Sequence, residues 1–370
     1  MQEEDNKPAE TTAPDTAPET AAVTVPRPLP EQVNEPVTSE GNTYLHELCR
    51  QKAGKARIVE AVKTLGAVPD MPNAAGLPAL AYAISDGDSE TVACLRDLGA
   101  SIVTGDFNAV LYAVDANKPE ALGVLLRTGR GMGVNTGGLL VNKDISADTP
   151  LLAALSAPRE DMIAALLDAG ALVELRRTKD GATALHLAAG RNTSDHAVAL
   201  LQAGADATCR NNEGQTPFHL AAADGRIAVL QAMIDHGVDI DARNASGHTP
   251  LHTAVIKKQI DCVKILLAAG ATVDAPMPDM YDETALMAAA RRGYDEIAIE
   301  LLVAGADALA QNKSGQTAAD LVSQQNHREL YDFMKSEESF RLRDHFEKAH
   351  RALIEEKKFV GPKAPPRFGR

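Results

Sequence analysis

The amino-acid sequence predicts an all-α solenoid, in which short helical units are stacked one after another along the chain. A similar phrase of residues returns about every 33 residues, a period typical of repeat proteins. Only 4% of the 370 residues are aromatic and none is Trp, so the core has to be built from Ala, Leu, Val and Ile in closely packed helices. Pro and Gly recur at fixed places in each unit, where they favour helix starts and helix ends.

The repeated unit begins with a phrase led by Thr and ends with a phrase built around Gly. The leading residues, at steps of 33, 33, 35 and 33, are Thr183, Thr216, Thr249, Thr284 and Thr317. Thr149 precedes this series by 34 residues. The closing phrase pairs two large apolar residues with a later Gly and a small residue, as in Leu266-Leu267-Ala268-Ala269-Gly270-Ala271.

These phrases resemble the ankyrin repeat family, whose Thr-Pro-Leu-His-x-Ala phrase and Gly-Ala phrase occur in register. The resemblance implies a solenoid of about eight or nine helix-turn-helix units joined by β-hairpin loops. It is close over residues 148–335 and degenerate over residues 39–129, where units such as Thr43-Tyr44-Leu45-His46 lack the Pro. Residues 130–147 exceed the usual spacing, which predicts an inserted loop.

The physical chemistry of individual positions supports this interpretation. Pro217 fits the first helical turn, where its missing N–H costs nothing, and Thr216 before it can cap a free amide. Gly225 and Gly293 fall where a first helix has to stop in a left-handed residue. Because one helix pair cannot bury its apolar face alone, residues 39–335 are expected to form a continuous stack of neighbours.

The segment before the stack predicts a disordered tail. Residues 1–38 are rich in Pro, Thr, Ala and Glu and poor in large apolar side chains, so they bury too little surface to offset the entropy of ordering. Residues 1–40 carry nine acids against two bases, a balance of −7.

The segment after the stack predicts an amphipathic helix and a flexible basic end. Leu342, Phe346, Ala349 and Leu353 share one face of a helix over residues 336–360. This helix has three possible roles: a cap on the last unit, a ligand for a groove in a partner, or a membrane-surface helix. Residues 361–370 form the basic tail.

Charge and composition exclude several classes of function. The net charge of −14 argues against general affinity for nucleic acid, because phosphate binding requires clustered Lys and Arg. No apolar run approaches the roughly 18 residues of a membrane span. Four widely spaced cysteines without a CxxC pair argue against a zinc or redox site. A cytoplasmic location is the simplest expectation, and export to a periplasm or beyond is expected if a signal peptide is removed before Met1.

Two features invite a chemical hypothesis, and neither supports one. His186, His219 and His252 recur at one repeat position, but neighbouring units are separated by roughly 8–10 Å, whereas metal ligands lie about 2 Å from the ion. The family resemblance implies instead that these imidazoles hydrogen-bond the backbone between loops. The Gly-rich run over residues 129–138 lacks the Lys-Ser/Thr and the strand–helix context of a phosphate loop. We therefore expect no catalytic residues, no cofactor and no metal.

The function expected from this fold is that of a non-catalytic scaffold, a monomer that binds a partner protein through the concave face of the stack. The resemblance implies that hairpin tips and exposed positions of the first helices make the contacts. The residues at those positions are Lys179, Asp180, Arg191, Asn212, Glu213, Gln215, Asp224, Ser246, His248, Ile256, Lys257, Arg291 and Arg292.

Two alternatives remain open at this point. The chain could serve as a structural spacer or regulatory subunit, in which case its concave face would tolerate charge reversal. An enzyme would need its site on the stack itself, because the flanking segments are shorter than the 50 or so residues that a domain usually needs.

Overall fold

The computed structural model describes most of the chain between residues 26 and 334. The described residues are 26–129, 132–139, 145–146, 148–157, 159–191, 193–322 and 328–334. The first 25 residues of the expected tail, the helix expected at 336–360 and the basic end at 361–370 lie outside them. Two compact units divide the chain, Met1–Ala109 and Val110–Arg370.

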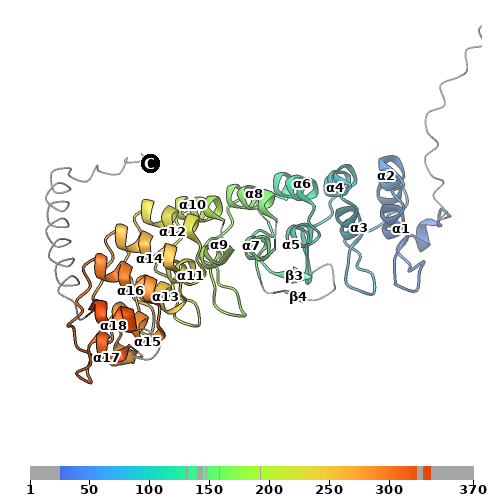
Figure 1. Ribbon diagram of the computed structural model, residues 1–370. Coiled ribbons are helices and arrows are strands. Elements are labelled where there is room, and N and C mark those ends of the chain that lie inside the picture. Colours follow the sequence, from blue (N-terminus) through green and yellow to red (C-terminus); the bar gives the residue numbers. More distant parts are fainter. Residues whose placement is uncertain are drawn as a thin grey trace, which may run out of the picture. The chain divides into compact units, whose positions relative to one another are not determined.

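Unit 1 contains two pairs of antiparallel helices followed by a short hairpin (Figure 1). The helices are α1 (Tyr44–Arg50), α2 (Lys55–Lys63), α3 (Ala79–Asp86) and α4 (Ser89–Asp97). We call the odd-numbered helices of the chain first helices and the even-numbered helices second helices. In unit 1, α1 packs against α3 and α2 against α4, so the first and second helices form separate layers. Strands β1 (Val103–Thr104) and β2 (Phe107–Asn108) pair antiparallel, with Val103 opposite Asn108.

The segment before α1 is more ordered than its composition predicts. Residues 26–38 belong to the expected tail, yet they contain a 3₁₀ helix, η1 (Pro30–Gln32), and the side chain of Val33 is only 1% exposed. The Asn34 amide donates to the carbonyl of Gly66 at 3.1 Å and accepts from the amide of Val68 at 2.9 Å. One apolar side chain and one bidentate amide therefore attach this segment to the first helix pair, although its composition alone favours disorder.

Unit 2 continues the pattern of helix pairs. Helix α5 (Ala109–Asp115) starts on the last residue of unit 1, and α6 (Pro119–Gly129) follows it. The next helices are α7 (Pro150–Ser156), the short η2 (Glu160–Met162) with α8 (Ile163–Asp168), α9 (Ala184–Arg191), α10 (Ser194–Gln202), α11 (Pro217–Ala223), α12 (Ile227–Asp235), α13 (Pro250–Ile256), α14 (Ile260–Ala268), η3 (Pro278–Met280), α15 (Ala285–Arg292), α16 (Asp295–Val303), α17 (Ala318–Leu321) and α18 (Arg328–Met334).

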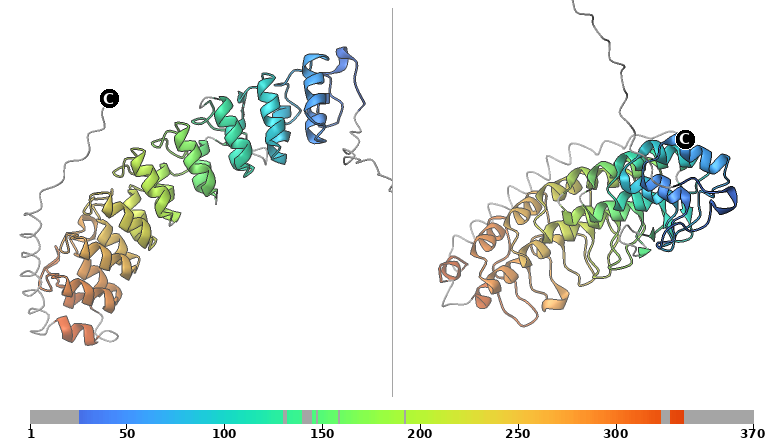
Figure 2. Two further views of the ribbon diagram at one scale, coloured as in Figure 1. Left: turned by 90° about the horizontal axis from the view of Figure 1, so that it is seen from above. Right: turned by 90° about the vertical axis from the view of Figure 1, so that its right-hand side faces the viewer.

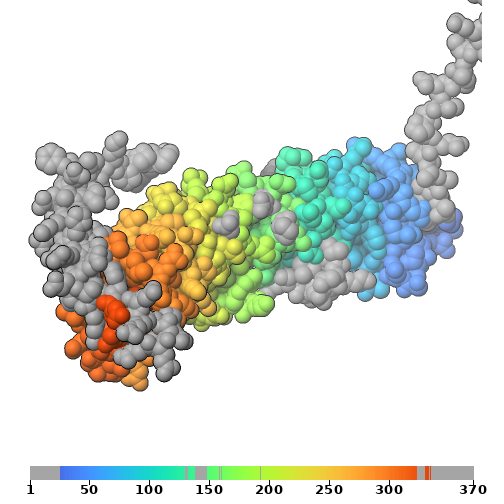
Figure 3. All heavy atoms as spheres, in the orientation of Figure 1, coloured from blue at the N-terminus to red at the C-terminus, as the bar shows by residue number. Residues whose placement is uncertain are grey.

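The helices of unit 2 also lie in two layers (Figure 2). Each first helix from α7 to α15 packs against the next first helix, and second helices such as α12, α14 and α16 pack against one another. In the space-filling view the pairs form successive bands in sequence order, from green through yellow to orange (Figure 3). Each pair of unit 2 therefore shares its core with its neighbours in sequence, as expected of a helical solenoid.

The helix ends follow the sequence prediction. The hydroxyl of Thr216 accepts a hydrogen bond from the amide of His219, and Pro217 occupies the first turn of α11. Gly225, just after α11, has φ 68°, and Gly293 caps α15 in the left-handed region with φ 64°. Both glycines adopt a conformation that a Cβ would disfavour, which confirms them as stop signals for the first helices.

Polar side chains fasten the residues that follow six of the described second helices to the preceding repeat, which the sequence did not suggest. The carboxylate of Asp241 accepts from the amide of Thr272 at 2.9 Å, and Glu174 accepts from the amide of Asp206 at 2.7 Å. Equivalent bonds join Asn34 to Val68, Asp70 to Ser101, Asn135 to Leu172 and Asp274 to Asp307. The residue type varies, so the recurrence is hard to see in the sequence.

The expected insertion, residues 130–147, contains a small hairpin in its described part. Strands β3 (Gly138–Leu139) and β4 (Ile145–Ser146) pair antiparallel, with Leu139 opposite Ile145. Just before them, Val134 is 1% exposed and Asn135 bonds both the carbonyl of Gly170 and the amide of Leu172. The start of the insertion is therefore held against the following repeat.

Candidate functional site

The loops that precede the first helices of unit 2 form a row of fingers. We define the fingers as residues 172–183, 206–216, 239–249, 272–284 and 307–317, which precede α9, α11, α13, α15 and α17 respectively. In the right-hand view of Figure 2 these loops project on the same side of the unit. The finger face is defined as these fingers together with the exposed ends of the first helices that follow them.

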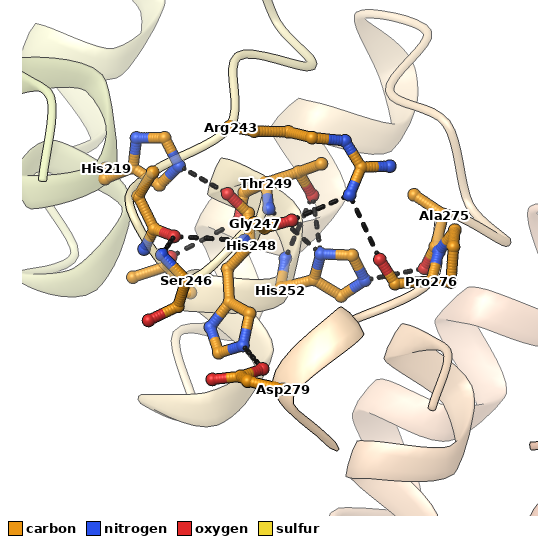
Figure 4. Close-up of polar contacts among 12 residues, drawn as sticks. His219, Arg243, Ser246, Gly247, His248, Thr249, His252, Ala275, Pro276 and Asp279 are labelled. Carbon is orange, nitrogen blue, oxygen red and sulfur yellow. Dashed lines mark hydrogen bonds and ion pairs between the residues drawn. The ribbon is translucent and has the colours of Figure 1, made fainter. Parts of the chain in front are cut away.

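Buried histidines of α9, α11 and α13 each fix the finger that follows. The amide of Thr249 donates to Nδ1 of His252 at 3.0 Å, so the ring proton is on Nε2 and donates to the carbonyl of Ala275 at 2.8 Å (Figure 4). His219 makes the same link to the carbonyl of His248 at 2.8 Å, and His186 to that of Gln215 at 3.0 Å. The predicted backbone role of these imidazoles is confirmed, and His46 of unit 1 contacts the carbonyl of Leu77 in the same way.

Burial keeps these imidazoles neutral. Desolvation lowers the pKa of His219 and of His252 to about 4, against the opposing effect of the hydrogen bond to the backbone carbonyl. It lowers the pKa of His46 and His186 in the same direction. A neutral ring supplies one acceptor and one donor, which matches contacts with the preceding Thr at Nδ1 and with a backbone carbonyl at Nε2.

The tips of three fingers are Asx turns, built on Asn211, Asn244 and Asn312. The side-chain oxygen of Asn211 accepts from the amides of Glu213 at 3.1 Å and Gln215 at 2.9 Å. The amide of Asn212 donates to the carbonyl of Asp180 in the preceding finger at 2.9 Å. Side chains on neighbouring fingers are therefore presented in a fixed register.

The structure places the thirteen predicted contact residues on the finger face, with different degrees of exposure. Eight are exposed, namely Lys179, Arg191, Asn212, Glu213, Asp224, Ser246, Lys257 and Arg291. The other five, Asp180, Gln215, His248, Ile256 and Arg292, are half-buried.

Several of these side chains have a structural partner already. Asp180 pairs with Arg177, and His248 lies 2.6 Å from the carboxylate of Asp279 in the next finger (Figure 4). Arg191 donates to the carbonyl of Ser156, and Arg291 pairs with a buried glutamate. The contacts of Arg191 and His248 join adjacent repeats, whereas those of Asp180 and Arg291 lie within one repeat.

A second group shows no such partner. Among the residues that the structure describes, no side-chain hydrogen bond or ion pair is found for Lys179, Asn212, Glu213, Asp224, Ser246 and Lys257. Exposed polar side chains on a rigid backbone are suited to contacting another protein.

Three side chains that the sequence analysis missed cap the ends of first helices. Arg226 donates to the carbonyl of Gly190 at 3.1 Å, and Gln259 to that of Ala223 at 3.1 Å. Arg159 reaches the carbonyl of Asp115 at 2.8 Å in the same way. Each donor stands ten residues after the Thr that begins its unit, a spacing that could have revealed them.

Exposed arginines line one edge of the fingers and were also missed. Arg210 donates to the carbonyl of Arg243 at 2.7 Å, and Arg243 donates to the carbonyls of Gly247 at 2.7 Å and Pro276 at 3.1 Å (Figure 4). Arg176 bonds the carbonyl of Arg210. These guanidinium groups link successive fingers through hydrogen bonds to backbone carbonyls.

One hollow lies in unit 1. It has a volume of about 670 Å³ and is lined by the ordered N-terminal segment, including Arg27, Leu29 and Val37, together with Glu47 of α1. Its described lining contains no Ser, Cys or His, and Arg27 reaches out to Glu60.

The described residues offer no other chemical centre. No group of three or more His, Cys, Asp or Glu among them could hold a metal ion. Cys49, Cys94 and Cys262 are buried free thiols, and burial raises the pKa of each. No helix in the described part of the chain is long and apolar enough to cross a membrane.

Comparison with known families identifies the repeats. A family model described as ankyrin repeats (3 copies) matches residues 110–211 and 189–277, and one described as ankyrin repeats (many copies) matches residues 266–322. Together the matches span residues 110–322, which is more than half of the chain. Comparison with curated proteins gives no match.

Proposed function

Because the chain belongs to the ankyrin repeat family, we propose that it is a scaffold whose finger face in unit 2 holds a partner protein. Ankyrin repeats are in general protein–protein interaction modules, and proteins built from them are in general non-enzymatic scaffolds. In this proposal the chain acts as a monomer, and the finger face is the concave face of the stack. An interface of about 800 Å² per partner is the ordinary scale for such binding.

One observation carries the proposal. Six side chains of the finger face are exposed polar groups without a hydrogen bond or ion pair to another described residue, while the backbone beneath them is fixed by buried histidines and Asx turns. A rigid surface loses little conformational entropy on binding, so most of the contact energy remains available for affinity.

The finger before α15 adds an aromatic contact. Tyr281 is 66% exposed, and Tyr281 and Asp282 both adopt a left-handed conformation, with φ 56° and 58°. Lys313 holds this turn through its amide, which donates to the carbonyl of Tyr281 at 2.8 Å, and through an ion pair with Asp282 at 3.1 Å. Strained backbone is typical of functional segments, and exposed Tyr is enriched at interface hot spots.

The experiment is affinity capture from the native source followed by mass spectrometry, with the full chain and two charge-reversal variants as bait. The test variant is Glu213→Lys/Asp224→Lys, because both carboxylates are exposed on the finger face. The control is Asp235→Lys/Asp261→Lys, which makes the same charge change on exposed positions of the second helices α12 and α14. We expect a partner to be recovered with the full chain and the control and to be lost or reduced with the test variant.

The opposite outcomes count against the proposal. Equal recovery of the partner by both variants would place its binding elsewhere on the chain. Failure to recover any partner, combined with full function of the test variant in the source organism, would favour a structural spacer.

A further inference from the structure

Four basic residues gather at the ends of two neighbouring first helices. Lys257 and Lys258 directly follow α13, and Arg291 and Arg292 are the last residues of α15. Helices α13 and α15 pack against each other. The side chains of Lys257, Lys258 and Arg291 are exposed and that of Arg292 is half-buried. We call these four residues the basic cluster.

The helix dipole alone does not explain the basic cluster. The negative end of a helix favours Lys and Arg in general. The positions that match Arg291 and Arg292 in the first helices before α13 are nevertheless Ser156-Ala157, Gly190-Arg191 and Ala223-Asp224. One of these ends has no charge, one has a single base and one is acidic, so a concentration of four bases is particular to α13 and α15.

Most of the positive charge in the basic cluster is not neutralised within the described residues. Arg291 pairs with the buried Glu283. Arg292 donates only to a backbone carbonyl, and the Nζ of Lys258 lies 5.3 Å from the centre of the Tyr294 ring. No ion pair with a described carboxylate is found for Lys257, Lys258 or Arg292, although the chain as a whole carries a charge of −14.

A small hollow borders the basic cluster. It has a volume of about 200 Å³, and its lining includes Lys258, Ile260, Tyr294 and Ile297, with Asp295 and Glu296 on the side of α16. Two aliphatic side chains and an aromatic ring provide apolar surface beside the cationic groups. The hollow is therefore suited to one apolar side chain of a bound segment.

We propose that the basic cluster is the docking site for an extended acidic segment of the partner protein. This inference rests on the proposed function and specifies the chemistry of the segment that the partner presents. Lys257 and Arg292 occupy matching positions in adjacent repeats, whose first helices lie roughly 8–10 Å apart. A segment in the extended polyproline II conformation advances about 3.1 Å per residue with three residues per turn, so Asp or Glu residues three apart lie on one side and match this separation. An apolar residue next to these acids enters the hollow.

The surrounding charge favours a short acidic protein segment over a nucleic acid. Asp224 stands at the matching position of the preceding repeat and ends the basic surface there. A long polyanion would extend past the basic cluster onto an acidic chain, where repulsion grows with its length. A peptide with two or three carboxylates pairs with the basic cluster without meeting that repulsion.

The test is selection of peptides from a random linear display library against the full chain, followed by titration of the selected peptides by fluorescence polarisation. We expect selected sequences to be enriched in Asp or Glu at a spacing of three, beside an apolar residue, and to bind more weakly as salt is raised. Lys257→Glu/Arg292→Glu should weaken their binding by roughly tenfold or more.

Two further variants make the result specific. Lys55→Glu/Lys63→Glu makes the same charge change on exposed positions of the second helix α2 and should leave affinity unchanged. The neutral Lys257→Gln/Arg292→Gln variant, checked for an unchanged thermal midpoint, should give an intermediate loss and so exclude misfolding as the cause.

The outcomes separate this inference from the proposed function. Selected peptides that lack acidic enrichment, or that bind Lys257→Glu/Arg292→Glu as tightly as the native chain, would overturn the acidic segment while leaving protein binding by the finger face intact. Binding of single-stranded DNA that is tighter than that of any selected peptide and is abolished by Lys257→Glu/Arg292→Glu would replace it with a nucleic-acid surface. Selection of no peptide at all would count against both.

Discussion

The guanidinium of Arg226 donates a hydrogen bond from Nε to the backbone carbonyl of Gly190, 3.1 Å away in the preceding repeat. Gly190 lies in the last turn of α9, where helix carbonyls have no partner within the helix. Arg226 therefore caps one repeat with a side chain of the next, and this bond couples the stability of the two.

Removal of this cap should destabilise the stack. Arg226→Met keeps most of the aliphatic stem and removes the donor, so we expect the free energy of unfolding to fall by about 1–2 kcal/mol. The measurement is urea unfolding followed by circular dichroism. Arg127→Met, on an exposed position of the second helix α6, is the matched control and should change stability by less than about 0.5 kcal/mol. Equal effects of the two substitutions would show that the cap contributes nothing.

Two glycines with the same backbone conformation should differ in their tolerance of alanine. Gly214 and Gly237 have φ 73° and 82°, and a Cβ at either position meets the left-handed penalty of about 1 kcal/mol. A Cβ at Gly214 would also overlap the side chain of Ala245 and lie 3.1 Å from its backbone nitrogen, whereas nothing lies within 4 Å at Gly237.

We therefore expect Gly214→Ala to cost at least about 2 kcal/mol and Gly237→Ala about 1 kcal/mol. Thermal unfolding of the two variants side by side measures this difference. A larger loss for Gly237→Ala would contradict the contact between adjacent fingers.

Acid should weaken the fold through its buried histidines. Burial holds the pKa of His219 and His252 near 4, below the ordinary value of 6.5. Between those two pH values the unfolded chain binds protons that the folded chain excludes. Stability therefore falls as pH drops from about 6.5 to about 4, by up to roughly 1.4 kcal/mol per pH unit for each residue.

Urea unfolding at a series of pH values between 7.5 and 4.5 measures this slope. The variant His219→Gln/His252→Gln should be less stable at pH 7.5 and should show a shallower decline toward pH 4.5, because two of the titrating groups are gone. A decline as steep as that of the native chain would assign the acid sensitivity to other residues.

Cys209 should react slowly with alkylating reagents in spite of its partial exposure. Its thiol lies 3.4 Å from carboxylate oxygens of both Glu174 and Asp206. Burial and these two hydrogen bonds raise the pKa of Cys209 to about 12, so little thiolate is present at pH 8.

Iodoacetamide labelling followed by mass spectrometry checks this expectation. Labelling of the folded chain at Cys209 should be much slower than in urea, and Glu174→Gln/Asp206→Asn should accelerate it. Labelling at the same rate in the native chain and in this variant would show that the carboxylates do not control the thiol.

The sequence predicts those parts of the fold that depend on local rules. Thr216, Pro217 and Gly225 act within a single helix, so their roles follow from capping and backbone preferences alone. The role of His252 was implied by the resemblance to the ankyrin repeat family, and its bond to the carbonyl of Ala275 confirms it. Composition was less reliable for residues 26–38, where the burial of Val33 and two bonds from Asn34 are enough to order the segment.

The missed features depend on contacts between repeats. Arg226, Gln259 and Arg159 perform one task at one repeat position with different side chains, so no identical residue recurs. The hydrogen bond between His248 and Asp279 joins residues 31 positions apart and requires the stacking distance between fingers, which the sequence does not contain. For the candidate site, the positions of the contact residues could be predicted from the sequence. Which of those side chains already bond to the stack, and which show no such bond, depends on contacts between repeats and could not be predicted.

The central claim is that the finger face binds a partner protein, and hydrogen–deuterium exchange of the full chain with and without the captured partner tests it most directly. The account predicts slower exchange on binding in residues 206–216, 239–249 and 272–284, with unchanged exchange in the second helices α12, α14 and α16. Protection confined to those second helices, with the fingers unaffected, would contradict it.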